Sequence, residues 1–386
     1  MTKYRLEPLA NNVEEMFIGP FGSSLKNDCF VDESEAYCMV YEQKHAIQKN
    51  MNLETRYVNE QKYNELKRFN VKGGDIIVSC RGTIGETYVV PDDAPLGIMH
   101  PSIMKIRLKE GVYDKHYFDL LLKSRLKKHE SEANGSGVKM AISATALGKE
   151  LFPVPSIAEQ NEISKILYTV SDIIAKRTEE LNKFDNLIKA RFVELFGFPV
   201  SNTKSFSTEL MEKVAPAVNY SGEFDKEVWL LNLDMVEAQT GRILDYLIVT
   251  EEEVGNSTCT FDTSNVLYSK LRPYLNKVVI PDRCGYATSE MVPLQPVKSK
   301  INREYLAFML RSDEFVNMIN EKVAGAKMPR VSMGDFRKFD VPIPPMKLQE
   351  QFADFVKQVD KSKVVVQKAL DEAQLLFDCL MQEYFG

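Results

Sequence analysis

A stretch that the chain contains twice constrains its fold more than any other feature. The first copy covers residues 151–197 and the second covers residues 341–386. Gln160 matches Gln349, and both copies close on a Phe-Gly pair. Every matched pair is separated by 189 residues, without a gap. Scattered identities at one constant separation indicate a single element that was duplicated within the chain.

Each copy predicts a long helix that follows a rigid, extended segment. Pro153 and Pro155 predict this segment in the first copy, because a residue before proline avoids the helical conformation. Ser156 and Glu159 fit a capping box, in which two side chains satisfy free backbone N–H groups at the start of a helix. In the second copy Pro345 fits the first helical turn, where its missing N–H group leaves no bond unmade.

Apolar residues recur every seven positions within each predicted helix. This line consists of Leu167, Ile174, Leu181, Ile188 and Leu195 in the first helix, and of Phe352, Val359, Val366, Ala373 and Leu380 in the second. A sustained period of seven predicts a coiled-coil seam, so the two helices can pair with each other. Arg177 and Lys363 interrupt the seam, which predicts modest pairing that a partner assists. At about 1.5 Å per residue, each helix would extend roughly 50–60 Å.

The regions in front of the two helices repeat each other in outline. Residues 75–79 and 265–269 both predict apolar strands, and the matched segments keep a separation of 188 to 190 residues. We therefore predict an α+β fold that contains two mixed α/β domains, each followed by a long helix. The predicted domains are residues 1–152 and 198–340, and the predicted helical regions are residues 153–197 and 341–386.

Several patterns predict local structure in the first domain. Residues 17–26, FIGPFGSSLK, predict a glycine- and serine-rich loop that ends in a lysine. Residues 73–93 predict a strand, a glycine turn and another strand, and residues 98–108 predict one further strand. Residues 117–130 predict a basic helix.

The composition indicates a globular chain of two or three domains, with 386 residues of which 44% are hydrophobic. No apolar run approaches the roughly 18 residues of a membrane span, and residues 1–5 lead into no signal-peptide core. The six cysteines form no CxxC pair, which favours free thiols in a reducing compartment. We therefore expect a cytoplasmic protein that does not contact a membrane.

The charge balance argues against a protein that coats nucleic acid through phosphate contacts alone. The chain has 49 Lys and Arg residues against 55 Asp and Glu residues. Its net charge therefore gives no general attraction to a polyanion. This balance leaves open a DNA-binding protein whose basic groups lie in local patches.

Catalytic motifs are absent from the sequence. An adenine methyltransferase needs Asn or Asp before Pro-Pro-aromatic, and Pro344-Pro345 has neither partner. The sequence contains no GxxxxGK[ST] phosphate loop. All four histidines lie in the first half, which excludes a duplicated histidine site, and Cys29 and Cys38 lack a second ligand pair for zinc. We expect neither a catalytic site nor a metal site in this chain.

Basic, glycine-flanked loops occupy matching places in the two domains. The predicted DNA-binding residues are Lys26, Arg81 and Lys139 in the first domain, and Lys270, Arg272, Tyr274, Asn276, Lys277, Lys327 and Arg330 in the second. Residues 268–277 alternate aromatic, basic and amide groups, a mixture suited to phosphate anchoring and base-edge readout. The alternative is a solvated loop with routine charges, and the repetition in both domains gives the two interpretations equal weight.

Three segments relate the chain to a known family. They are VPSIAEQNEISKIL at residues 154–167, VPIPPMKLQEQFADFV at 341–356 and LIKARFVELFGFP at 187–199. A proline-rich segment, a Gln and a long helix, repeated after two variable domains, resemble the specificity subunit of a type I restriction–modification system. The resemblance covers essentially the whole chain. Ser156 differs from the family pattern, since the second copy has Pro345 at the matching position. We expect the helix to form equally well, because serine caps the start of the same helix.

The resemblance implies two target-recognition domains held apart by an antiparallel coiled coil of the repeated helices, related by a pseudo-twofold axis. Each domain would read one half of a bipartite, asymmetric site in double-stranded DNA, and the helices would set the unread spacer. Half-sites on one face of DNA lie about 34–36 Å apart, which a helix of this length accommodates. The subunit would itself be non-catalytic.

The resemblance also implies partners. Two methyltransferase subunits would dock on this chain and methylate a flipped adenine with S-adenosylmethionine, and restriction subunits would use ATP and Mg²⁺. No cofactor is therefore expected in this chain. By the same analogy, the starts of the two helices around Gln160 and Gln349 would be the docking surfaces.

Two other classes of function stay open on the sequence. An enzyme with a degenerate motif would transfer methyl groups or cut DNA without a partner. A coiled-coil scaffold would use its globular domains to bind protein, and charge reversal at Lys270, Arg272 and Lys327 would leave its activity unchanged.

Overall fold

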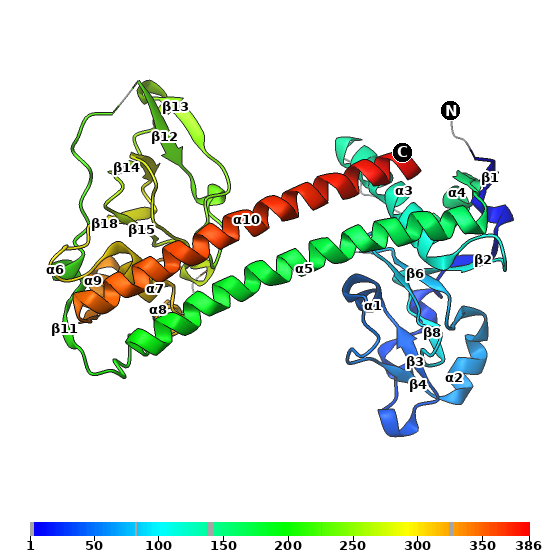
Figure 1. Ribbon diagram of the computed structural model, residues 1–386. Coiled ribbons are helices and arrows are strands. Elements are labelled where there is room, and N and C mark those ends of the chain that lie inside the picture. The colour runs from blue at the N-terminus through cyan, green and yellow to red at the C-terminus, as the bar shows by residue number, and fades with distance from the viewer. Residues whose placement is uncertain (1–3, 82, 137–142, 225, 324–326) are drawn as a thin grey trace. The chain divides into compact units, whose positions relative to one another are not determined.

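The computed structural model describes residues 4–81, 83–136, 143–224, 226–323 and 327–386. The chain divides into unit 1, residues 1–175 and 370–386, and unit 2, residues 176–369. Each unit contains one α/β domain and one end of each long helix, α5 (Ile157–Phe196) and α10 (Met346–Phe385) (Figure 1). The units cut across the predicted division into domains and helices, because each helix end packs on the domain beside it.

The described part of unit 1 contains two four-stranded sheets and one strand pair. The first sheet is antiparallel and has the order β2 (Val13–Ile18), β9 (Ile103–Leu108), β6 (Ile76–Ser79) and β7 (Thr87–Val89). The second has the order β4 (Tyr57–Val58), β3 (Cys38–Tyr41), β8 (Gly97–Met99) and β5 (Asn70–Val71), with β3 and β8 parallel. The strand pair joins β1 (Leu6–Pro8) to β10 (Leu151–Pro153).

Unit 2 has the same three groups of strands. Its antiparallel sheet has the order β16 (Val278–Val279), β15 (Val266–Ser269) and β18 (Met291–Leu294). Its mixed sheet has the order β13 (Leu247–Thr250), β12 (Glu227–Leu231), β17 (Gly285–Thr288) and β14 (Thr258–Phe261), with β12 and β17 parallel. The strand pair joins β11 (Ser207–Leu210) to β19 (Asp340–Ile343).

The two units therefore share one topology, which confirms the duplicated frame. In each mixed sheet the parallel pair occupies the centre, and in each unit the last strand before the long helix pairs with the first strand of the domain. Strand β2 is the main difference. Its place in the described part of unit 2 is taken by a bridge between Ala217 and Leu294.

Strands β6 and β15 lie at the centre of each domain because both of their faces are buried. In β6, Ile76 and Val78 face the helices while Ile77 faces the other sheet. In β15, Tyr268 joins the helix-side core and Leu267 joins the core between the sheets. A strand buried on both faces needs a continuous apolar run, which the sequence has at both places.

Shorter helices complete each domain. Those of unit 1 are α1 (Gln43–Gln48), α2 (Glu60–Glu65), α3 (Lys115–Ser136) and α4 (Ala144–Lys149). Those of unit 2 are α6 (Met211–Val214), α7 (Arg303–Arg311), α8 (Asp313–Lys322) and α9 (Met333–Arg337). Helix α3 confirms the helix predicted for residues 117–130, and α7 occupies the equivalent place in unit 2.

The single strand predicted for residues 98–108 is wrong. The chain forms β8 and β9 here, and these strands belong to different sheets. Pro101 lies in the turn between them, where the His100 carbonyl accepts the N–H of Ile103 at 3.2 Å. Proline has no N–H to give to a sheet, so the ladder stops at this residue.

The start of α5 matches the predicted capping box. The N–H of Glu159 donates to Oγ of Ser156 at 3.4 Å, and the N–H of Ser156 donates to Oε2 of Glu159 at 3.1 Å. In α10, Pro345 directly precedes the first helical residue instead of lying in the first turn, and its carbonyl accepts the N–H of Leu348 at 2.9 Å.

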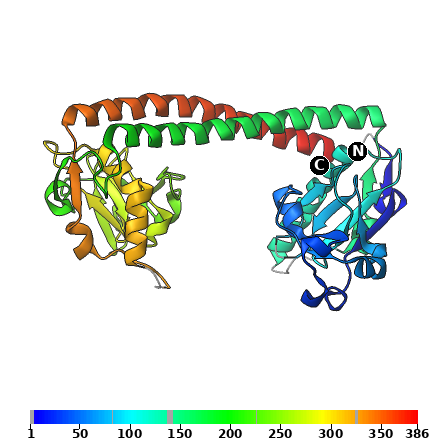
Figure 2. The same ribbon diagram turned by 90° about the horizontal axis from the view of Figure 1, so that it is seen from below.

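The two long helices pair in each unit, as both views show (Figure 1 and Figure 2). In unit 1, Leu167 near the start of α5 is buried with Phe385 at the end of α10. In unit 2, Phe192 near the end of α5 packs on Phe352 near the start of α10, with ring centroids 5.4 Å apart. The pairing is therefore antiparallel within each unit.

Polar residues interrupt the seam, as predicted. Nζ of Lys363 lies 2.5 Å from Oδ1 of Asp185, across the two helices. At the unit 2 end, Phe192 and Phe196 are more deeply buried than the predicted seam residue Leu195. Among the described residues, no helix combines the length and apolar composition needed to cross a membrane.

Candidate nucleic-acid interface

Three loops of unit 2 meet where β15 ends, and we call residues 270–277, 288–291 and 327–331 the unit 2 loop cluster. Backbone hydrogen bonds join them. The N–H of Lys270 donates to the carbonyl of Glu290 at 3.0 Å, and the N–H of Arg272 donates to the carbonyl of Pro329 at 2.8 Å. The N–H of Val331 donates back to the carbonyl of Lys270 at 2.9 Å. Segments that are 60 residues apart in sequence thus form one surface.

This cluster brings together four of the predicted DNA-binding residues. Arg272 and Lys327 are exposed, Lys270 is half-buried, and Arg330 is exposed with its guanidinium 2.7 Å from Glu290. Among the described residues, Lys270, Arg272 and Lys327 have no ion-pair partner. Cations without a carboxylate partner remain available for phosphate oxygens or base edges.

A short 3-10 turn, Pro273–Leu275, presents Tyr274 at the edge of the cluster. The Tyr274 ring is 47% exposed. Its backbone carbonyl accepts a hydrogen bond from Nε2 of Gln239 at 2.8 Å. The hydrogen bond from Gln239 therefore holds the backbone of this turn, while the Tyr274 ring faces solvent.

The structure corrects two predicted DNA contacts in the same segment. Asn276 is only 6% exposed, and its Nδ2 donates to the carbonyl of Arg311 at 3.0 Å. Nζ of Lys277 donates to the carbonyl of Leu233 at 2.6 Å, and burial lowers the pKa of this lysine. Both side chains hold the loop in place: Asn276 is buried, and the half-buried Lys277 directs its ammonium group to a backbone carbonyl.

Unit 1 has a related arrangement at the end of β6, in which two of the three loops correspond to those of unit 2. The N–H of Cys80 donates to the carbonyl of Ser102 at 2.8 Å, and the N–H of Gly19 donates to the carbonyl of Ile103 at 2.9 Å. We call residues 19–26, 80–81, 83–86 and 100–103 the unit 1 loop cluster. A Cβ on Gly19 would lie 2.3 Å from the carbonyl oxygen of His100, so this close approach requires glycine.

The predicted contacts of unit 1 have different outcomes. Arg81 is exposed directly beyond β6, and Lys26 is exposed at the far end of the glycine-rich loop. Lys139 lies outside the described residues. His100 is half-buried beside Ser102, with Nδ1 and Oγ 2.7 Å apart, and burial lowers the pKa of its imidazole.

Phe21 is not among the residues predicted from the sequence to bind DNA. Its side chain is 87% exposed, although it is one of the largest apolar side chains in the unit 1 loop cluster. The N–H of Ser24 donates to the Phe21 carbonyl at 2.8 Å, so a defined turn carries the ring. The available signal was its place between Pro20 and Gly22, outside any alternating or helical apolar pattern.

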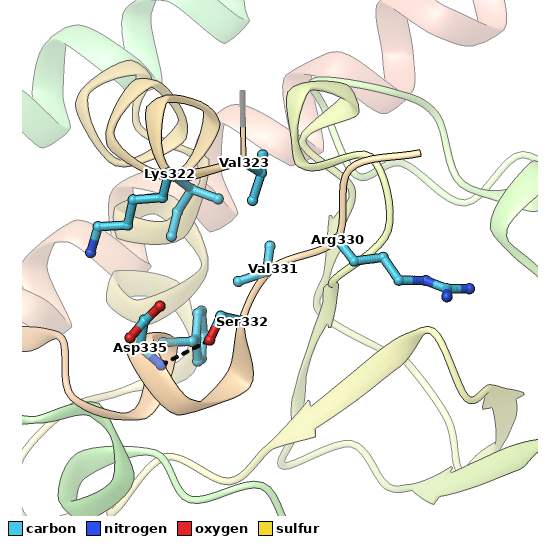
Figure 3. Close-up of a pocket in the computed structure, with 8 residues that line it drawn as sticks. Lys322, Val323, Arg330, Val331, Ser332 and Asp335 are labelled. Atoms are coloured by element: carbon cyan, nitrogen blue, oxygen red, sulfur yellow. Dashed lines mark hydrogen bonds between the residues drawn. The ribbon is translucent and has the colours of Figure 1, made fainter. Parts of the chain in front are cut away.

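A surface cavity lies beside the unit 2 loop cluster (Figure 3). Its volume is about 290 Å³, and its lining residues are Ile319, Lys322, Val323, Arg330, Val331, Ser332, Asp335 and Phe336. Arg330 extends away from the other lining side chains, while Ser332 Oγ accepts the N–H of Asp335 at 3.4 Å as the cap of α9. The cavity places Lys322 and Asp335 beside an apolar wall, and its described lining residues include no nucleophile paired with a base.

The structure also corrects the predicted docking residues. Gln160 and Gln349 are fully buried, with no exposed surface. Neither side chain can touch a partner as the chain is folded.

Among the residues that the structure describes, no group of three His, Cys, Asp or Glu residues is placed to hold a metal ion.

Comparison with known proteins gives a consistent set of relatives. The family described as "Type I restriction modification DNA specificity domain" matches residues 24–183 and 238–373. The specificity subunit of the type I restriction enzyme EcoDI from Escherichia coli is 27% identical over 138 residues, which cover 36% of this chain and 30% of that subunit. The MjaVIII specificity subunit from Methanocaldococcus jannaschii is 20% identical over 347 residues, which cover 80% of this chain and 77% of that subunit.

Two solved structures have a similar fold. One comes from a study of complex assembly and conformational transition of the type I R-M system. It has a TM-score of 0.56 at 12% identity, and the alignment covers 99% of this chain and 97% of that structure's chain. The other is the S subunit of the type I restriction-modification system from M. genitalium. It has a TM-score of 0.54 at 14% identity, and the alignment covers 100% of this chain and 96% of that structure's chain. At these identities the likeness extends to the fold alone.

Proposed function

The chain belongs to the family of type I restriction–modification specificity subunits, and from this premise we propose that it reads a bipartite, asymmetric DNA site for enzymes bound beside it. Each α/β domain contacts one half-site through its loop cluster. This chain carries out no chemistry itself. Methyl transfer and cleavage take place in partner subunits.

The single observation that carries this proposal is the repetition of two loops of the cluster in both units. The loops that follow β6 and β15 are each joined to the turn before a neighbouring strand by an equivalent backbone bond, from the Cys80 N–H to the Ser102 carbonyl and from the Lys270 N–H to the Glu290 carbonyl. The third loop differs, because it is residues 19–26 in unit 1 and residues 327–331 in unit 2. The side chains differ: Phe21 and Arg81 mark one cluster, and Arg272 and Tyr274 mark the other. A repeated frame with unlike side chains suits two different half-sites, and hence an asymmetric site.

The exposed groups suit the two parts of DNA recognition. Lys270, Arg272 and Lys327 supply charge for phosphate contacts, which set register and orientation. Arginine also pairs with guanine O6 and N7 in the major groove. Because the chain as a whole is acidic, these few cations and not its net charge must supply the attraction to DNA.

The paired helices suit the role of a spacer. Each has 40 residues, which corresponds to about 60 Å at 1.5 Å per residue. Two half-sites on one face of the duplex lie about 34–36 Å apart. The antiparallel pairing seen in each unit supports a pseudo-twofold arrangement, in which the two domains take equivalent roles.

The partners follow from the same proposal. Two methyltransferase subunits that bind S-adenosylmethionine, and restriction subunits that use ATP and Mg²⁺, would assemble on this chain, which binds no cofactor itself. Gln160 and Gln349 are buried, so docking would use exposed residues of the helices and not these two amides.

Methylome sequencing tests the proposal directly. Cells that express this chain with its methyltransferase should carry a methylated adenine motif of two parts separated by unread bases. The motif should vanish when either gene is removed. Methyl transfer or cleavage by the purified chain alone would instead establish an enzyme.

Charge reversal distinguishes a DNA reader from a protein-binding scaffold. Replacing Lys270, Arg272 and Lys327 with Glu should lower the affinity of the assembled complex for its site by more than about tenfold. Arg283→Glu is the matched control, because Arg283 is exposed on another loop and pairs with Asp282. A scaffold would keep its protein partner and show equal DNA protection for all variants.

A further inference from the structure

Gln160, in the first turns of α5, is the centre of a hydrogen-bonded joint in unit 1. Its side chain is fully buried. Oε1 accepts the N–H of Asp114 at 2.8 Å, while Nε2 donates to the carbonyl of Val112 at 3.0 Å and to the carbonyl of Pro155 at 2.9 Å. One amide thus ties the long helix to the proline segment and to the segment in front of α3.

Gln349 forms the same joint in unit 2. Oε1 accepts the N–H of Asn302 at 2.9 Å, and Nε2 donates to the carbonyls of Lys300 at 2.9 Å and Pro344 at 2.8 Å. Lys300 and Asn302 lie directly in front of α7, the equivalent of α3. All three bonds therefore have equivalent partners in the two units.

The acceptor and donor residues of each joint are themselves fixed. Asp114 caps α3 by accepting the N–H of Tyr117 at 2.8 Å, and Asn302 caps α7 by accepting the N–H of Tyr305 at 2.8 Å. The joint thus reaches the rigid first turn of a domain helix. A tyrosine adds a further tie in each unit, from Tyr113 to the Pro153 carbonyl at 3.0 Å and from Tyr305 to the Pro342 carbonyl at 2.9 Å.

Three directional bonds restrict the helix more than apolar packing does. Hydrogen bonds weaken steeply once the donor and acceptor leave a narrow range of distance and angle. Apolar contacts such as those of Ile163, one turn further along α5, tolerate small sliding and rotation because the hydrophobic effect has no direction. The amide therefore sets the angle at which the helix leaves its domain, and the apolar core supplies the stability.

We propose that Gln160 and Gln349 are positioning residues that fix the direction of each long helix relative to its recognition domain, and through it the spacer length that the complex accepts. This inference rests on the proposed function, since it concerns a DNA site with two halves. It replaces the predicted docking role of the two glutamines with an internal one.

The test measures spacer preference of the assembled complex with its methyltransferase subunits. Duplexes carry the bipartite site found by methylome sequencing, with the spacer lengthened or shortened by one or two base pairs. The readout is methylation at each altered spacer divided by methylation at the natural spacer. This ratio does not depend on how much of a variant folds and assembles.

The variants remove the joint from one unit or from both. Gln160→Met and Gln349→Met keep the length of the side chain and lose all three bonds. Gln160→Glu keeps the acceptor for the Asp114 N–H and places a carboxylate oxygen, which cannot donate, against the carbonyls of Val112 and Pro155. We expect the ratio at neighbouring spacers to rise about five- to tenfold, the factor that corresponds to roughly one net hydrogen bond, because directional bonds no longer fix the direction of the helix. The double variant should show the broadest preference.

Matched controls weaken the same regions without touching the joint. Ile163→Val and Val356→Ala remove buried methyl groups from the core around α5 and α10, so they should lower the yield of complex and leave the ratio unchanged. If the glutamine variants also keep the wild-type ratio, the positioning role is refuted. If wild-type complex methylates no two-part site at all, the proposed function fails, and this outcome is separate from the first.

Discussion

Arg272 has a backbone φ of +50°, and Asn276 has a φ of +49°, in the left-handed region that most side chains avoid. Such conformations cost on the order of 1–3 kcal/mol and persist where surrounding contacts impose them. Here the Arg272 N–H bonds to Pro329 and the Asn276 side chain bonds to Arg311. The loop shape that exposes Tyr274 is therefore imposed by residues far away in sequence.

Replacing the exposed ring of Phe21 should separate binding from stability. Phe21→Ala should change the free energy of unfolding by less than about 0.5 kcal/mol, because the ring packs on little. It should weaken DNA binding by the complex by about tenfold, the effect of losing one apolar contact to a base pair in a groove of the duplex. Urea unfolding and DNA titration measure the two effects.

The control for this prediction is a ring of the same kind in the core. Phe152 is fully buried, so Phe152→Ala should cost about 3–5 kcal/mol of stability. Phe21→Trp should retain DNA affinity. Wild-type affinity of Phe21→Ala would show that the ring does not meet DNA.

Buried His45 and half-buried His100 should make unit 1 sensitive to mild acid. Burial lowers the pKa of both His45 and His100. As pH falls through about 6.5, the histidine pKa in the unfolded chain, these side chains bind protons in the unfolded state but stay neutral in the folded state. Proton binding therefore favours the unfolded state. Stability should therefore decrease between pH 7.5 and pH 5.5.

Urea unfolding at a series of pH values checks this expectation. His100→Asn should flatten the curve over this range relative to wild type, because the variant has lost one group that the folded state keeps neutral. Parallel curves for the two proteins would contradict the expected contribution of His100.

At the scale of elements, the unit 2 end of the coiled coil depends on a cluster of aromatic rings. Phe352 lies 5.4 Å from Phe192, 5.5 Å from Phe196 and 5.2 Å from Phe308, measured between ring centroids. These rings come from both long helices and from α7. They therefore join the coiled coil to the domain.

Removing the central ring of this cluster should destabilise unit 2 strongly. Phe352→Ala should lower the free energy of unfolding by about 3–5 kcal/mol, through lost burial and the cavity that remains. Val365→Ala on the same helix is the control: Val365 is 69% exposed, so its change should stay within about 0.5 kcal/mol. Equal losses in denaturant unfolding would mean that the ring cluster does not carry this junction.

For the molecule as a whole, duplication predicts that the two half-sites are read independently. Arg81 belongs to the unit 1 loop cluster and Arg272 to the unit 2 loop cluster. Arg81→Ala should relax base preference in one half of the methylated motif, and Arg272→Ala in the other half. The effects of distant residues on free energy should add in the double variant.

Methylome sequencing of cells that carry each variant measures this prediction. The matched variant is Arg283→Ala, which lies on a different loop and should leave both halves unchanged. Relaxation of the same half by both Arg81→Ala and Arg272→Ala would contradict independent reading.

Some predictions from sequence succeeded because they depend on residues close together in the chain. The capping box at Ser156 and the seven-residue seam each follow from the local geometry of one helix. Duplication extended sequence-based prediction to distant parts of the chain. A second copy at a constant separation marks equivalent elements even when their contacts are unknown. The α+β class, the two domains and the paired helices could all be derived in this way.

The folded chain alone decided which polar side chains are available. Residues 268–277 suggested one continuous binding loop, yet Arg272 and Tyr274 face solvent while Asn276 and Lys277 bond to backbone carbonyls of other segments. Gln160 and Gln349 were placed on a docking surface and lie inside instead. Residue type determines which groups a side chain can bond to, and the sequence gives every residue type. Whether its partner is a distant carbonyl or an external ligand depends on long-range packing, which periodicity and composition do not encode.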